Sequence, residues 1–138
     1  MKPSHIEHIG IAVKDLASAI DFYENVLGLT CYNIEEVADQ NVRTAFFMVG
    51  ETKIELLAST DPEGPIGKFI EKKGEGIHHI AFSVEKIEDH LKHASEMGIT
   101  LIDSKPRKGA EGLDIAFLHP KSTSGVLMEL CEKKQLTT

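Results

Sequence analysis

The sequence predicts an α+β fold made of two tandem βαβββ modules. Three observations support this: a strand motif that occurs twice, a helical pattern after each copy, and a second strand motif that ends each module. Residues 8–13 (HIGIAV) return as 79–84 (HIAFSV), and residues 53–57 (KIELL) return as 127–131 (LMELC) at nearly the same separation. A duplicated unit explains these matches.

The first module, about residues 5–58, begins with the strand at 8–13. Apolar residues at helical spacing from Leu16 to Leu27 predict a helix, with Asp15 as N-cap and Gly28 as C-terminal stop. The strands expected after this helix are 29–37, 42–49 and 53–57.

A helical linker, about residues 59–75, joins the modules, with a short helix over 65–73 that begins at a proline and ends before Gly74. The second module, about residues 76–131, repeats the helical stripe at Ile87, Leu91, Ala94 and Met97 and ends it at Gly98. Its other strands are expected at 99–103, 113–118 and 127–131. Together the segments form one domain over residues 1–138.

Composition excludes several classes of partner. The chain has 138 residues, with 41% hydrophobic and 27% charged residues, as soluble globular domains do. Its net charge of -7 argues against nucleic acid, and it contains no apolar run of membrane-spanning length. The N-terminus lacks the apolar core of a secretion signal, so we expect a cytoplasmic protein or an unmarked organelle address. Cys31 and Cys131 are expected to be reduced.

Strand alternation places four candidate ligands in one phase. In the first copy Ile9, Ile11 and Val13 share the face that suits packing under a helix, so His8 lies on the opposite, open face. The same phase selects His79 rather than His78, and it places Glu55 and Glu129 opposite the apolar residues of their strands. Imidazole nitrogens and carboxylate oxygens suit a divalent metal with positions open for water or substrate. The alternative is that these are satisfied core histidines and solvent-facing glutamates.

The motifs at these residues resemble those of the methylmalonyl-CoA epimerases, in the vicinal oxygen chelate (glyoxalase-like) superfamily. The resemblance covers nearly the whole chain, through residues 8–13, 76–82 (GIHHIAF), 117–122 (FLHPKS) and 125–130 (GVLMEL). The first two segments are common to the superfamily, and the third resembles the epimerases in particular, as does the helical linker.

The resemblance implies a curled mixed sheet around one metal ion held by His8, Glu55, His79 and Glu129. Some members have Gln where this chain has Glu55, so the ligand set here carries one more negative charge. Cobalt is the metal that the family suggests, with manganese next, and the residue types also allow zinc or nickel. In certain members an acidic residue proposed as a proton acceptor lies where this chain has Thr44, which cannot serve as a base.

The implied reaction removes the C2 proton of methylmalonyl-CoA, between a thioester and a carboxylate, and returns a proton to the other face. A Lewis acid stabilises the enolate, and a carboxylate base adds roughly 10² to 10⁴-fold. Glu129 is the leading base, with Glu55 or a metal-bound water for the other face.

Two further segments are candidate contacts for the CoA thioester. Lys121, Ser122 and the turn up to Gly125 offer charge and backbone N–H groups to the substrate carboxylate, or they form an ordinary exposed turn. Arg107 lies in a basic run, 104–109 (SKPRKG), that is either a contact for CoA phosphates or a solvated patch.

Other functions fit the same scaffold. A glyoxalase I-like isomerase acting on a hemithioacetal would use a similar ligand set, and a non-catalytic relative that sequesters a ligand would need no metal. An extradiol dioxygenase uses two histidines and one carboxylate, so the fourth ligand argues against it. The family also suggests a homodimer.

Overall fold

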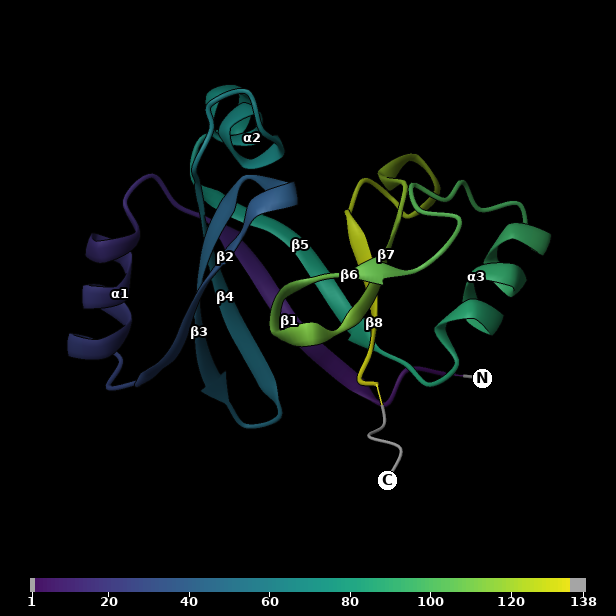
Figure 1. Cartoon of the computed structure of the whole chain (residues 1–138), viewed down its shortest axis with the longest axis horizontal. Coiled ribbons are helices and arrows are strands. Elements are labelled where there is room, and N and C mark those ends of the chain that lie inside the picture. The colour runs from purple at the N-terminus through teal and green to yellow at the C-terminus, as the bar shows by residue number, and fades with distance from the viewer. Residues whose placement is uncertain (1, 135–138) are drawn as a thin grey trace. The chain divides into compact units, whose positions relative to one another are not determined.

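The chain contains eight strands and three α-helices in the computed structural model, which describes residues 2–134 (Figure 1). It divides into two compact units, here called the first unit (residues 8–78) and the second unit (residues 2–7 and 79–134). Among the described residues, no helix has both the length and the apolar character needed to cross a membrane. The fold is α+β, and each unit follows the predicted βαβββ order.

The first unit is a four-stranded sheet in the order β2-β3-β4-β1, in which β1 and β4 are parallel and the other neighbours antiparallel. The first unit also holds the two helices α1 and α2. Its elements are β1 (His5–Ala12, which enters the unit at His8), α1 (Leu16–Asn25), β2 (Cys31–Val37), β3 (Val42–Val49), β4 (Thr52–Ser59) and α2 (Pro65–Lys73).

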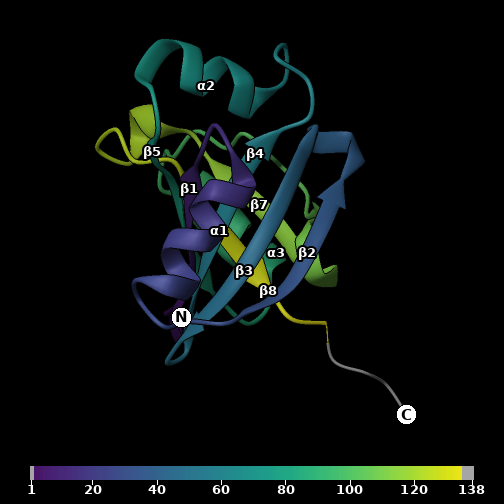
Figure 2. The same ribbon diagram turned by 90° about the vertical axis from the view of Figure 1, so that its left-hand side faces the viewer.

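Helix α1 lies against one face of this sheet, as Figure 2 shows. Asp15 caps it as predicted, because the Asp15 carboxylate accepts hydrogen bonds from the N–H of Ala17 at 3.0 Å and of Ser18 at 3.4 Å. Ile11 and Val13 pack with the helix, which confirms the predicted phase of β1. The opposite, open face therefore carries His8.

The second unit repeats this plan with the strand order β5-β8-β7-β6, again with one parallel pair, β5 and β8. Phe82, Val84 and Leu130 pack against Ile87 and Leu91 of the helix. Its elements are β5 (Gly76–Ser83, which enters the unit at His79), α3 (Ile87–Glu96), β6 (Arg107–Lys108), β7 (Asp114–Leu118) and β8 (Met128–Glu132).

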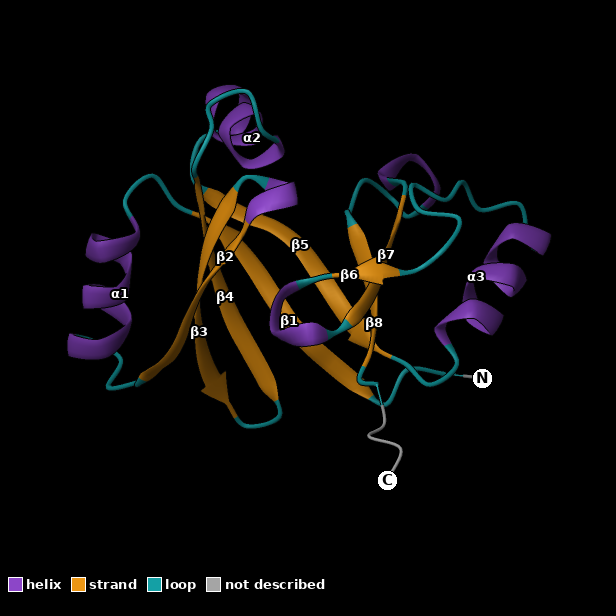
Figure 3. Ribbon diagram, in the orientation of Figure 1, coloured by secondary structure: helices purple, strands orange, loops and turns teal. Residues whose placement is uncertain are grey.

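The strand predicted at residues 99–103 is wrong. This segment is a loop after α3 in Figure 3, with a single bridge between Leu101 and Leu118, and the strand at this place in the module is the two-residue β6. The N–H groups of Ile102 and Asp103 both donate to the Phe117 carbonyl, at 2.9 and 3.2 Å. The Asp103 carboxylate in turn accepts from the Phe117 N–H at 2.9 Å. A side chain thus replaces a backbone acceptor, and the ladder cannot continue.

Candidate metal centre

The first unit buries a histidine beside a glutamate on its open face. His8 on β1 and Glu55 on β4 lie on adjacent parallel strands, and Nε2 of His8 is 3.4 Å from Oε1 of Glu55. Gly10 lies directly opposite Glu55 in the ladder, and since it has no side chain, the imidazole two residues earlier reaches the carboxylate. Both residues are 5% exposed.

The second unit repeats this pair. His79 on β5 and Glu129 on β8 lie on adjacent parallel strands, with Nε2 and Oε1 3.1 Å apart. The small residue opposite Glu129 is Ala81, in the place of Gly10. His79 and Glu129 are 5% and 4% exposed. The structure therefore joins the four predicted ligands as two matched pairs, one in each unit.

The geometry of each pair fits two neighbouring ligands of one divalent ion. Metal–nitrogen and metal–oxygen bonds are about 2.0–2.2 Å long, so adjacent ligand atoms lie about 3.0 Å apart in an octahedral site and about 3.4 Å apart in a tetrahedral one. The measured separations are 3.1 and 3.4 Å. Burying a carboxylate costs free energy unless it is paired or bound to a cation. Each glutamate here has a histidine as its partner, and the same two side chains suit a shared cation.

His78, which the strand phase excludes, takes a different environment from the two paired histidines. Its ring contacts Phe69 of α2 edge-to-face, with the ring centroids 4.9 Å apart. The choice of His79 over His78 therefore agrees with the position of each side chain. Thr44, at the place of the acidic residue in some family members, is buried, and its hydroxyl donates to the Glu35 carbonyl at 3.0 Å.

Arg107 and His79 both lie against one aromatic ring, that of Phe117. Phe117 is opposite Glu129 in the β7–β8 ladder, and its ring lies edge-to-face with His79, at 5.6 Å between centroids. The Arg107 guanidinium lies over the same ring, with its Cζ atom 5.6 Å from the ring centroid. Asp103 holds Arg107 by an Nε–H to Oδ1 hydrogen bond of 3.1 Å. Phe117 and Asp103 were not predicted as site residues from the sequence, because both act through contacts across strands.

The other predicted substrate contacts lie on the turn between β7 and β8. A short 3₁₀ helix, Pro120–Ser122, carries Lys121 and Ser122, and Gly125 follows with φ of +83°. Four N–H groups of this turn already donate within it: those of Lys121, Ser122, Thr123 and Gly125. The Ser122 hydroxyl accepts from the Thr100 N–H at 2.9 Å. The side chains of Lys121 and Ser122 are therefore better candidates for a substrate contact than these backbone donors.

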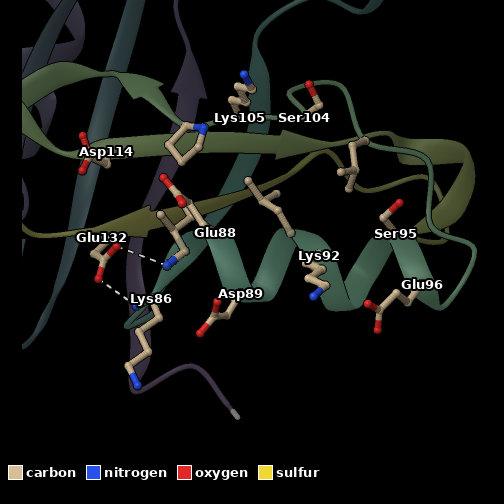
Figure 4. Close-up of a pocket in the computed structure, with 14 residues that line it drawn as sticks. Lys86, Glu88, Asp89, Lys92, Ser95, Glu96, Ser104, Lys105, Asp114 and Glu132 are labelled. Atoms are coloured by element: carbon tan, nitrogen blue, oxygen red, sulfur yellow. Dashed lines mark hydrogen bonds between the residues drawn. The ribbon is translucent and has the colours of Figure 1, made fainter.

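A groove of about 1030 Å³ lies beside α3, lined by charged residues of both signs (Figure 4). Ser104, Lys105 and Pro106 of the predicted basic run line it, whereas none of the four candidate metal ligands does. Glu132, at its edge, accepts hydrogen bonds from the N–H groups of Lys86, the N-cap of α3, and Ile87, its first residue. The Glu132 carboxylate therefore already accepts from the N–H groups at the N-terminus of α3. The groove is separate from the pair His79 and Glu129, because neither residue lines it.

Comparison with known proteins gives a consistent family. Residues 7–117 match the model of the Glyoxalase/Bleomycin resistance protein/Dioxygenase superfamily. The chain is 47% identical to the uncharacterized protein YqjC of Bacillus subtilis, covering 95% of this chain and 94% of YqjC. It is 39% identical to the ethylmalonyl-CoA/methylmalonyl-CoA epimerase of Cereibacter sphaeroides, covering 91% of this chain and 95% of that protein.

A solved structure shares the fold closely. The chain superimposes on Streptomyces coelicolor methylmalonyl-CoA epimerase in complex with 2-nitronate-propionyl-CoA with a TM-score of 0.94 and 33% identity, covering 99% of each chain. The match confirms the glyoxalase-like fold expected from the motifs. The chain therefore belongs to the glyoxalase/bleomycin resistance/dioxygenase superfamily and, within it, to the methylmalonyl-CoA epimerase family.

Proposed function

We propose that this chain is a methylmalonyl-CoA epimerase, which interconverts the (R) and (S) forms of its substrate by removing and returning the C2 proton. The observation that carries the proposal is the buried His–Glu pair that recurs in both units. Its support is membership of the family and the similarity to named epimerases over more than nine-tenths of the chain.

The four paired residues, His8, Glu55, His79 and Glu129, are the ligands of one divalent ion in this proposal. The separation of the nitrogen and oxygen in each pair supports it. Such an ion, when bound, supplies a Lewis acid for the thioester and carboxylate oxygens of the substrate. Cobalt is our first choice, and manganese, zinc and nickel suit the same donors.

Proton transfer falls to the carboxylates of this site. Glu129 takes the C2 proton on one face of the substrate, because it is buried beside His79 on the open face of its sheet. Glu55 holds the equivalent position in the first unit, which makes it a candidate for the opposite face. Inversion follows when the proton is returned to the face from which it was not removed.

The substrate contacts extend from Phe117 to the turn between β7 and β8. Arg107, beside the Phe117 ring, binds a CoA phosphate, and the Lys121 ammonium with the Ser122 hydroxyl binds the substrate carboxylate. Gly125 lets this turn close at a positive φ that other residues rarely adopt. We also propose a homodimer, and exposed apolar residues at the end of α1, such as Val26, support it. Light scattering would measure the mass of the particle in solution.

The test is C2 deuterium exchange on methylmalonyl-CoA with metal-stripped protein reconstituted one ion at a time. We expect exchange and epimerisation to return with a divalent ion, cobalt most strongly, at one ion per chain. Glu129→Gln should bind the ion more weakly and slow exchange by about 100-fold or more. Turnover of a hemithioacetal without exchange on methylmalonyl-CoA would overturn the proposal in favour of a glyoxalase I-like isomerase. Ligand binding with no turnover of either compound would indicate a sequestering relative.

A further inference from the structure

The open face of the first unit carries a second glutamate besides Glu55. Cross-strand partners in an antiparallel ladder share a face. Glu55 is opposite Phe46, and Glu35 on β2 is opposite Thr44, two residues from Phe46 along β3. Glu35 therefore shares a face with Phe46 and Glu55, whereas its neighbour Glu36 lies on the other face.

Burial agrees with this assignment. Ala45 and Phe47 pack in the cluster under α1, while Phe46 and Thr44 are buried outside that cluster. Glu36 is exposed and Glu35 is half-buried. The Glu35 backbone is also fixed, because its carbonyl accepts from the hydroxyl of the buried Thr44 at 3.0 Å.

The duplicated ladder gives Glu35 a counterpart in the second unit. There Phe117 is opposite Glu129, as Phe46 is opposite Glu55, and Arg107 is opposite Ile115, two residues from Phe117. Arg107 is thus the equivalent of Glu35. The Arg107 guanidinium lies over the Phe117 ring, and the same ring contacts His79. In the first unit, Glu35 holds the equivalent ladder position, on the face that carries Phe46 and Glu55.

Glu35 and Glu55 lie apart on the open face of the first unit. Glu35 and Glu55 are two strands and two residues apart, which corresponds to about 12 Å between their Cα atoms from standard strand spacing and rise. The two carboxylates therefore belong to separate positions on the open face. Glu35 is also outside the proposed ligand set, whereas Glu55 is held at 3.4 Å from His8.

We propose that Glu35, rather than Glu55, transfers the proton on the second face of the substrate; the inference rests on the proposed epimerase function. The Glu35 carboxylate takes the proton from C2, the C–H bond breaks, and its electron pair moves into the enolate. A proton from the Glu129 side then forms the new C–H bond on the opposite face. The two groups exchange roles for the other enantiomer, and exchange with solvent resets their protons.

The experiment compares Glu35→Gln with Glu36→Gln, a matched change on the neighbouring residue of the same strand. Each enantiomer of methylmalonyl-CoA is incubated separately in D₂O with metal-loaded protein, and loss of the C2 proton is followed by NMR alongside epimerisation. Thermal unfolding and metal content are measured for each variant. Glu35→Gln should slow C2 proton loss from one enantiomer by about 100-fold or more, leave the other within about threefold, and retain its metal. Glu36→Gln should match the wild type.

The outcomes separate this inference from the function on which it rests. Wild-type rates for both enantiomers with Glu35→Gln would overturn the role of Glu35 alone, and so would an equal loss for both. A wild-type protein that exchanges neither enantiomer would overturn the epimerase function and this inference with it. If Glu35→Gln does not fold, Glu35→Asp keeps the charge but withdraws the carboxylate by one methylene, and it must slow the same single enantiomer.

Discussion

Removing the Glu132 carboxylate should destabilise the start of α3. Lys86 is the N-cap residue before this helix; it has φ of +53° and makes no side-chain cap hydrogen bond. Glu132, the last residue of β8, supplies the missing acceptors: Oε2 accepts from the Lys86 N–H at 2.7 Å and Oε1 from the Ile87 N–H at 3.1 Å (Figure 4). One carboxylate thus satisfies two donors that a helix N-terminus otherwise leaves unpaired.

The expected cost of Glu132→Ala is about 2 kcal/mol in the free energy of unfolding. A helix cap contributes about 1 kcal/mol, and here a charged acceptor makes two hydrogen bonds beside the positive end of the helix dipole. With a urea slope of about 2 kcal/mol/M, the midpoint should fall by about 1 M. Hydrogen exchange at the Lys86 and Ile87 amides should accelerate.

Two companion variants make this test specific. Glu96→Gln, in the last turn of the same helix, removes a carboxylate where the dipole disfavours it and should change stability by less than about 0.5 kcal/mol. Lys86→Gly should stabilise by up to about 1 kcal/mol, because it relieves the positive φ while keeping both N–H donors. A midpoint for Glu132→Ala within about 0.2 M of the wild type would refute the capping argument.

Three other predictions follow from the helix cap and the site. Asp15→Ala should lower the urea unfolding midpoint at pH 7, because it removes the acceptor of the Ala17 and Ser18 N–H groups. Hydrogen bonds from Ser18 hold the pKa of Asp15 below its usual 3.8, so its stabilisation is present above that pH and is lost as the pH falls through the lower, folded value. Cobalt at about 100 times its Kd should add about 2.7 kcal/mol to wild-type stability and raise Tm, an effect that His79→Ala should abolish and EDTA reverse. Arg107→Ala should raise KM for the CoA thioester by about 10-fold with little change in kcat, and a lower kcat at unchanged KM would argue against a phosphate contact.

The main features of the fold follow from local pattern in the sequence. Strand alternation has a period of two, so the placement of His8 and His79 on the open faces needs only the phase of the apolar residues beside them. The helix ends also follow locally, because Gly28 and Gly98 adopt positive φ where the stripes stop. The matched pairs of the candidate site were predictable for the same reason, since each ligand lies on a strand with a clear alternation.

The features that the sequence did not predict depend on contacts between distant residues. The apolar residues at 99–103 resemble a strand, but Asp103 takes up the Phe117 N–H with its side chain and interrupts the ladder. The place of Arg107 beside Phe117 depends on the register of β6 against β7, which a two-residue strand does not signal. The face on which Glu35 lies could not be predicted for a similar reason, because an irregularity between Cys31 and Asn33 shifts the alternation of β2.

The two units repeat the backbone more closely than the charge. Both helices need an acceptor at their N-terminus, and the first obtains it from Asp15, whereas the second has Lys86 at that position and obtains the carboxylate from Glu132. The open faces differ in the same way, with Glu35 in one unit and Arg107 at the equivalent position in the other. In the proposed epimerase these two positions have different tasks: Glu35 transfers a proton at C2, whereas Arg107 offers a cation to a CoA phosphate. The substitution Glu35→Arg removes the carboxylate and places a cation at both positions. It should therefore abolish epimerisation even if the metal stays bound.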